Sequence, residues 1–161
     1  MRKIIKETHF SYYMKKGIDY IGIGCGAINF NKEGKVFLAK RAPKARNEIG
    51  KWDFPGGSVE FGEKCKDAIK REILEEYNFK IQVIGLLEVV DHIIPKENQH
   101  WISPSFIAKH VSGNPKIIEP EKRTEIKWVN LSEIDPNSLT ITSRSNFEEY
   151  IKKYGFKLDK N

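Results

Sequence analysis

The sequence lacks the features of several protein classes. It has only two cysteines, Cys25 and Cys65, far apart in the chain, which excludes a disulfide-rich scaffold and a cysteine metal site. No apolar run approaches the roughly 20 residues that a membrane-spanning helix needs. The first 17 residues carry mixed charges around no apolar segment, so we expect no signal peptide and a reducing, cytoplasmic location.

Repeats, low-complexity tracts and arginine-rich runs are also missing, and the lysines are spread along the chain. With 28 Lys and Arg against 22 Asp and Glu, the net charge is +6. A modest positive excess favours small anionic ligands over a nucleic-acid partner, although ordinary solubility explains it equally well. A length of 161 residues suits one domain over 1–161, with 1–16 as an N-terminal extension.

Strands and helices are mixed without regular alternation. This pattern predicts an α/β fold with a mixed sheet covered by helices. Pro55-Gly56-Gly57 is predicted as a turn, and Pro104 should place its strand at a sheet edge or a bulge. We predict strands over 19–30, 35–41, 52–54, 80–92, 100–111 and 125–131, a helix over 63–77, and short helical segments over 131–134 and 145–155.

The helix over 63–77 groups its carboxylates unusually. On a helical wheel, Cys65, Ala68, Ile69 and Ile73 share one core-facing arc, whereas Tyr77 falls on the polar side or its flank. Glu72, Glu75 and Glu76 lie within or beside the apolar arc. Carboxylates there repel one another and lose hydration, so a cation must compensate. Mg²⁺, a hard ion that takes carboxylate oxygens, fits; the alternative is a solvated cluster paired with lysines.

These residues resemble a known motif. Gly57, five residues, Glu63, seven residues and then the run from Arg71 to Phe79 resemble the Nudix box, here residues 57–79. Only Asn78 departs, because glycine is usual there. The position follows the helix and requires a left-handed backbone, which asparagine accepts. The resemblance covers about residues 19–135 and is strongest to the MutT-like branch of nucleoside triphosphate pyrophosphatases.

The resemblance implies a Nudix-type α/β/α sandwich with a loop–helix–loop catalytic box. It also implies a Mg²⁺ cofactor, with Mn²⁺ as a substitute. Glu72 and Glu76 would be direct metal ligands, with Glu75 and the Gly56 carbonyl contributing. Arg71 would organise the box carboxylates through charge-assisted hydrogen bonds, and Glu63 would support the loop.

The reaction implied is attack of water on phosphorus, with a carboxylate as proton acceptor. Candidates for this base are Glu75 or Glu76 in the box, and in a later loop Glu121 first and Glu119 second. The candidates for substrate binding are Arg41, Trp52, His100 and Trp101, with Phe54 also considered. Core packing or, for Arg41, a surface ion pair is the alternative for each of these five.

The resemblance makes a nucleoside triphosphate the leading substrate, cleaved to monophosphate and pyrophosphate. ADP-ribose, nucleotide sugars, dinucleoside polyphosphates and RNA 5′ ends stay open, and so does a non-catalytic nucleotide-binding module. A small-molecule nucleotide is the expected partner, and no membrane partner is expected. No sequence feature fixes an interface, so the homodimer found in many relatives stays open too.

Overall fold

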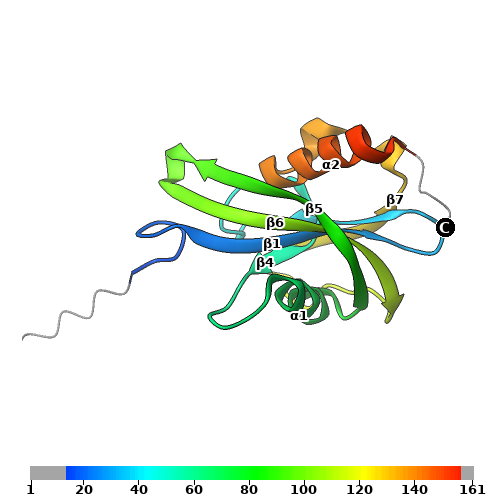
Figure 1. Cartoon of the computed structure of the whole chain (residues 1–161), viewed down its shortest axis with the longest axis horizontal. Coiled ribbons are helices and arrows are strands. Elements are labelled where there is room, and N and C mark those ends of the chain that lie inside the picture. The colour runs from blue at the N-terminus through cyan, green and yellow to red at the C-terminus, as the bar shows by residue number, and fades with distance from the viewer. Residues whose placement is uncertain (1–13, 157–161) are drawn as a thin grey trace, which may run out of the picture.

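Two helices cover opposite faces of one mixed β-sheet in this computed structural model, which describes residues 14–156 (Figure 1). The predicted α/β/α arrangement is therefore confirmed, whereas most of the predicted extension, residues 1–13, lies outside the described part. The strands are β1 (Gly22–Phe30), β2 (Val36–Arg41), β3 (Trp52–Asp53), β4 (Gly56–Ser58), β5 (Lys80–Ile94), β6 (Gln99–Ser112) and β7 (Arg123–Val129). The helices are α1 (Cys65–Tyr77) and α2 (Ile141–Tyr154), with single 3₁₀ turns at Pro95–Glu97, Leu131–Glu133 and Pro136–Ser138.

The sheet has the order β3-β2-β1-β6-β5, while β4 pairs with β1 and β7 pairs with β2. Strands β1 and β6 are parallel, and β5 and β6 form a long antiparallel hairpin. Of the two alternatives predicted for Pro104, the sheet edge is wrong, because β6 lies between β1 and β5. The bulge agrees with the structure, since the pairing of β5 with β6 shifts register between Leu86 and Glu88, and Val89 pairs with Pro104.

The hydrophobic core lies in two clusters, one on each face of the sheet. On the α1 face, Tyr77 is fully buried and its ring packs against Phe37 with 5.2 Å between centroids. The wheel assigned Tyr77 to the polar side, which is wrong, because residues 116–118 cross the end of α1 and hydrogen bond to its last carbonyls. On the α2 face, Phe147 and Tyr150 of the helix pack on Ile28 and Leu87.

The two glycines after Pro55 form a strand and not the predicted turn. Gly56 pairs with Gly26, and Gly57 pairs with Cys25, so β4 lies directly beside β1. A Cβ on Gly56 would lie 2.5 Å from the Cys25 carbonyl oxygen, which explains why this approach requires glycine. As predicted, Asn78 ends α1 in the left-handed conformation, with φ 60° and ψ 34°.

Helices capable of crossing a membrane are missing from residues 14–156, since none is both long and apolar enough.

Candidate active site

A cleft of about 460 Å³ opens where β1, β4, α1 and the start of α2 meet. Gly24 and Gly26 of β1 form its floor, and their lack of side chains keeps the space open. Residues 42–51 form a loop along one side of the cleft. Glu48 anchors this loop, since its carboxylate accepts the Ile141 backbone N–H at 2.7 Å and lies 3.4 Å from His92 Nε2.

Glu72 reaches the cleft from the middle of α1. Its carboxylate accepts the Ser58 backbone N–H at 3.1 Å and a hydrogen bond from Arg71 Nη1 at 3.1 Å. The carboxylate packs against Gly57, where a Cβ would lie 2.0 Å from Glu72 Cδ. Burial raises the pKa of Glu72 above its ordinary value, even though Arg71 opposes the shift. A carboxylate whose pKa stays raised in spite of Arg71 favours a further cation nearby.

Glu76, one helical turn later, is buried in the same cleft. Burial raises its pKa, and the neighbouring guanidinium of Arg123 opposes this, with 3.5 Å between Arg123 Nη2 and Glu76 Oε2. That oxygen accepts no hydrogen bond from any described residue. Arg123 is itself buried and donates to the Tyr77 hydroxyl at 2.6 Å. One Glu76 oxygen is thus desolvated and keeps only the ion pair with Arg123, without a hydrogen bond from a described residue, which leaves it able to bind a cation.

Arg71, on the side of α1, hydrogen bonds to three glutamates of the box. Its guanidinium donates twice to Glu63, at 2.8 and 2.9 Å, and once to each of Glu72 and Glu75, both at 3.1 Å. A further bond reaches the Ser58 carbonyl at 3.1 Å. The hydrogen bonds from Arg71 lower the pKa of Glu63 to about 2. This geometry fits the predicted role of Arg71, which is to hold the box carboxylates in place through hydrogen bonds.

The wall opposite Glu72 carries a second charged network, centred on Asp53. Asp53 accepts hydrogen bonds from Arg41 at 2.9 Å, Ser143 at 2.8 Å and Thr140 at 3.0 Å. Arg123 lies 3.6 Å away and so bridges Asp53 and Glu76. Burial raises the pKa of Asp53, but these cations and hydroxyls outweigh it and hold the pKa below its ordinary value.

The donor set of the cleft fits a hard divalent cation. Glu72, Glu76 and Gly56 line the same space, and Mg²⁺ typically takes one or two carboxylates, keeps several waters and binds substrate phosphates. Within residues 14–156, no group of three or more His, Cys, Asp or Glu side chains is gathered closely enough to hold a metal. The fit rests on the buried Glu76 oxygen, which has an ion pair with Arg123 but no hydrogen bond from a described residue, while Glu75 is 58% exposed and paired with Arg71.

Among the residues predicted to bind substrate, the structure brings Arg41 and Trp101 to the cleft together with Phe54. Trp52 is not there, because it packs on the α2-side core below the ammonium groups of Lys40 and Lys127. His100 is also outside the lining. It adjoins Trp101 on β6, and successive strand residues point to opposite faces.

The loop candidates for the base differ in position. Glu121 is exposed and outside the cleft lining. Glu119 is half-buried and pairs with Lys122 at 2.6 Å, and the Lys122 side chain lines the cleft. The negative charge of Glu119 also contributes to the raised pKa of Glu76, after the larger effects of burial and Arg123. The structure therefore brings the second loop candidate, and not the first, toward the site.

Sequence reasoning missed Asp53, Arg123 and Asn146, all of which line the cleft. Arg123 lies in a polar segment, where solvation is the usual expectation, and Asp53 is a single charged residue between Trp52 and Phe54. Asn146 is 1% exposed and its Oδ1 has no hydrogen-bond partner among the described residues. Thr140 caps α2 by accepting the Ser143 N–H, so the helix starts at Ile141, earlier than the predicted residue 145.

Known proteins of similar sequence and structure identify the family of this chain. The sequence model of the NUDIX domain matches residues 21–150. The 8-oxo-dGTP diphosphatase of Escherichia coli (strain K12) is 34% identical over 116 residues, covering 71% of this chain and 87% of that protein. The RNA pyrophosphohydrolase of Bartonella bacilliformis is 26% identical over 155 residues, covering 81% and 89%. By contrast, the chain spans only 33% of the length of the putative nudix hydrolase 1 of Caenorhabditis elegans.

Among solved structures, that of a MutT NUDIX hydrolase from Burkholderia pseudomallei superposes with a TM-score of 0.74 at 35% identity, covering 81% of this chain and 98% of that one. The matched region of the NUDIX domain includes β4, all of α1 and the strands below them. With Arg71, Glu72, Glu75 and Glu76 at the box spacing on that helix, the chain belongs to the Nudix hydrolase family.

Proposed function

We propose that this protein hydrolyses a phosphoanhydride bond of a nucleoside triphosphate, with Mg²⁺ as cofactor, to give the monophosphate and pyrophosphate. One observation carries the proposal: Glu72 and Glu76 share a cleft with Arg41, Lys122 and Arg123. Carboxylates that hold a metal and cations that face phosphates are the two requirements of phosphoanhydride cleavage. The similarity to an 8-oxo-dGTP diphosphatase supports a triphosphate substrate.

The metal would be held by Glu72, Glu76 and the Gly56 carbonyl, and Mn²⁺ would substitute for Mg²⁺. When bound, it lowers the pKa of a water and neutralises charge on the phosphoryl oxygens. Arg71 keeps the Glu72 carboxylate in place through the hydrogen bond at 3.1 Å. Arg123 partly compensates Glu76 from the other side, and its charge opposes the rise in the pKa of this carboxylate that burial causes.

The cations of the far wall orient the substrate. Arg41 is fixed by Asp53 and by two hydrogen bonds to Asn47, both at 2.7 Å, so its guanidinium is already ordered. Lys122 approaches from the loop after β6. The deep end of the cleft, with Phe54 and the unpartnered Asn146 amide oxygen, offers one apolar and one polar group to the nucleoside.

We place the proton acceptor at Glu119, ahead of Glu121 and Glu75. The acceptor must reach a water at the metal, and Glu119 pairs with Lys122, which lines the cleft. Glu121 is exposed, and Glu75 is engaged with Arg71 on the outer side of α1. Substituting each glutamate by glutamine separates these assignments, since only loss of the acceptor lowers kcat steeply without weakening metal binding.

A product-resolved assay tests the function. The protein and its Glu76→Gln variant are incubated with Mg²⁺ and with nucleoside triphosphates, 8-oxo-dGTP, ADP-ribose and nucleotide sugars, and the products are separated. We expect monophosphate and pyrophosphate from triphosphates, and loss of this activity in the variant. Glu125→Gln is the matched control, because Glu125 is exposed and pairs only with Lys40. Cleavage of ADP-ribose or sugars alone overturns the substrate assignment, and no turnover of any compound overturns the function.

A further inference from the structure

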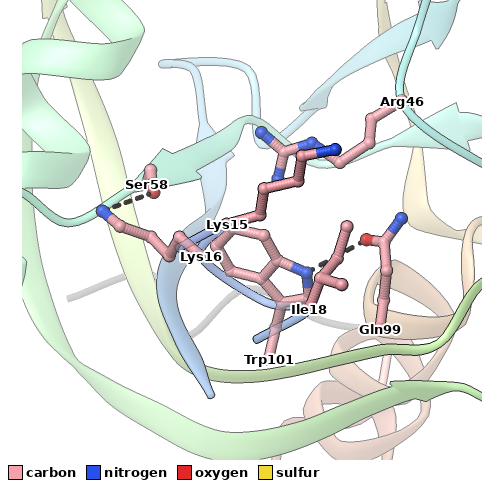
Figure 2. Close-up of a pocket in the computed structure, with 7 residues that line it drawn as sticks. All are labelled: Lys15, Lys16, Ile18, Arg46, Ser58, Gln99 and Trp101. Atoms are coloured by element: carbon pink, nitrogen blue, oxygen red, sulfur yellow. Dashed lines mark hydrogen bonds between the residues drawn. The ribbon is translucent and has the colours of Figure 1, made fainter. Parts of the chain in front are cut away.

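A second cavity, of about 420 Å³, adjoins the cleft (Figure 2). Three cationic side chains line it, Lys15 and Lys16 from the segment before β1 and Arg46 from the loop over 42–51. Arg46, Ser58 and Trp101 line both this cavity and the cleft. The Ser58 backbone N–H donates to Glu72, so the cavity adjoins the cleft beside this metal-ligand candidate and not beside Phe54 and Asn146.

No described carboxylate forms an ion pair with these three cations. Lys16 Nζ donates to neutral acceptors, the Ser58 hydroxyl at 3.2 Å and the Val59 carbonyl at 2.9 Å. The nearby carboxylate of Asp19 instead accepts the Lys15 backbone N–H. Arg41 and Arg123, which line the cleft but not this cavity, in contrast each have a carboxylate partner. Like charges gathered without a counter-charge create a positive potential that attracts an anion.

Among the described residues that line it, the cavity offers cations but no free aromatic face. Trp101 is 8% exposed, its Nε1 donates to Gln99 at 3.1 Å, and the Arg46 guanidinium lies over its ring at 4.7 Å from the centroid. The ring also packs against Gly17 and Gly22, where a Cβ would lie 2.2 and 2.3 Å from ring atoms. A nucleobase needs an open ring face to stack on, so this cavity suits a phosphate and not a second base.

We propose that Lys15, Lys16 and Arg46 around Trp101, which we name the basic annex, form a second anion subsite. It takes a phosphate of the substrate beyond the three of a simple nucleoside triphosphate. This phosphate is either a further unit of a polyphosphate chain or the phosphodiester after the first nucleotide of a 5′-triphosphorylated oligonucleotide. The proposal rests on the proposed function for its substrate, and it deepens that function by extending the substrate past a simple triphosphate.

The first test measures anion binding without metal or turnover. Tripolyphosphate is titrated against the metal-free protein, a Lys15→Gln variant and a Lys15→Gln/Arg46→Gln double variant. We expect roughly fivefold to tenfold weaker binding in the double variant, since one exposed charge pair contributes up to about fivefold. Lys15→Gln isolates the annex, because Lys15 does not line the cleft. A Lys32→Gln/Lys66→Gln variant removes the same net charge from two exposed lysines elsewhere.

The second test identifies the source of the phosphate. In the presence of Mg²⁺, kcat/KM is compared for a nucleoside triphosphate, a nucleoside tetraphosphate and a 5′-triphosphorylated dinucleotide. A selective loss for the dinucleotide in the annex variants assigns the subsite to a phosphodiester, and a selective loss for the tetraphosphate assigns it to a polyphosphate chain. An equal effect on all three substrates overturns the proposal.

The two tests separate failure of the annex from failure of the proposed function. If the protein cleaves no phosphoanhydride, the wild type is inactive in the second test, yet the first test still compares anion binding among the variants. Equal tripolyphosphate affinity in the wild type and the double variant overturns the annex. An equal loss in the Lys32→Gln/Lys66→Gln control also overturns it, because the effect would then come from net charge alone.

Discussion

The carboxylate of Glu72 lies directly against the α-carbon of Gly57. A Cβ built on Gly57 would lie 2.0 Å from Glu72 Cδ, and within 2.4 Å of both carboxylate oxygens. The atoms in the way belong to the end of a flexible side chain and not to the backbone. Any larger residue at position 57 would therefore displace a metal-ligand candidate while leaving the fold intact.

We expect Gly57→Ala to lower kcat/KM on the order of a hundredfold, because displacing a reacting group by about 1 Å has an effect of that size. The melting temperature should change little, since only the Glu72 carboxylate must move. Gly85→Ala is the matched control, because a Cβ at Gly85 meets no atom within 4 Å. Full activity of Gly57→Ala would show that Glu72 does not need its present position.

Arg71 should not be replaceable by lysine. The guanidinium makes two parallel hydrogen bonds to Glu63 while also reaching Glu72 and Glu75, and a lysine ammonium cannot reproduce this fork. We expect Arg71→Lys to lower kcat about tenfold to a hundredfold, as for other residues that orient metal ligands. The pKa of Glu63 should rise from about 2 toward its ordinary value, which NMR titration of the side-chain carbon measures.

Arg144→Lys is the control for Arg71→Lys, because Arg144 pairs with Glu148 on the exposed face of α2. A rise in the pKa of Glu63 with unchanged kcat would contradict the organising role of Arg71, since the network would then be broken without consequence for the reaction.

The catalytic helix could be predicted because its information is local. The box spacing, the apolar arc of Ala68, Ile69 and Ile73, and the left-handed Asn78 all follow from residues within one helix and its ends. The burial of Tyr77 could not be predicted, because it depends on residues 116–118, which reach Tyr77 only in the folded chain. The sequence position of a helix end does not show what will cover it.

The same distinction between local and tertiary information explains which of the substrate-binding candidates lie at the cleft. Arg41 and Trp101 lie at the cleft, but Trp52 and His100 were chosen for their type, and the face to which a strand residue points depends on register. Asp53 and Arg123 are brought together by the pairing of β2 with both β3 and β7. Their network is a tertiary feature, and no local pattern in either short segment indicates it.

Asn78 permits a direct test of the one departure from the box pattern. A left-handed conformation is unfavourable for residues with a Cβ by about 1 to 2 kcal/mol, less for asparagine, and is free of this strain for glycine. We expect Asn78→Ala to lower the free energy of unfolding by about 1 kcal/mol, and Asn78→Gly to leave it within about 0.5 kcal/mol. Denaturant unfolding measures both, and kcat should not change. Equal stability of the two variants would contradict the helix-end explanation.

Asp53 should make the free energy of unfolding depend on pH in the acid range. Burial raises its pKa, but Arg123, Arg41 and the hydroxyls of Ser143 and Thr140 outweigh burial and lower it overall. A carboxylate with a lowered folded-state pKa stabilises the fold fully above its unfolded value of about 4, and this contribution is lost as the pH falls through the folded-state value. Asp53→Asn removes the charge and leaves two arginines without this partner.

We expect Asp53→Asn to lower the free energy of unfolding at pH 7 by about 3 kcal/mol, the lower end for breaking a buried ion pair. The difference from wild type should shrink below about pH 4, because the unfolded wild-type chain then binds a proton at Asp53 that the folded protein binds only at lower pH. Glu72 titrates in both proteins and cancels in the difference, whereas Glu76 shares Arg123 with Asp53, so the variant should also lower the pKa of Glu76. Urea unfolding between pH 7 and pH 2 measures this, with Asp67→Asn as the exposed control. A difference that stays constant over this range would mean that Asp53 acts through its shape and hydrogen bonds, and not through its charge.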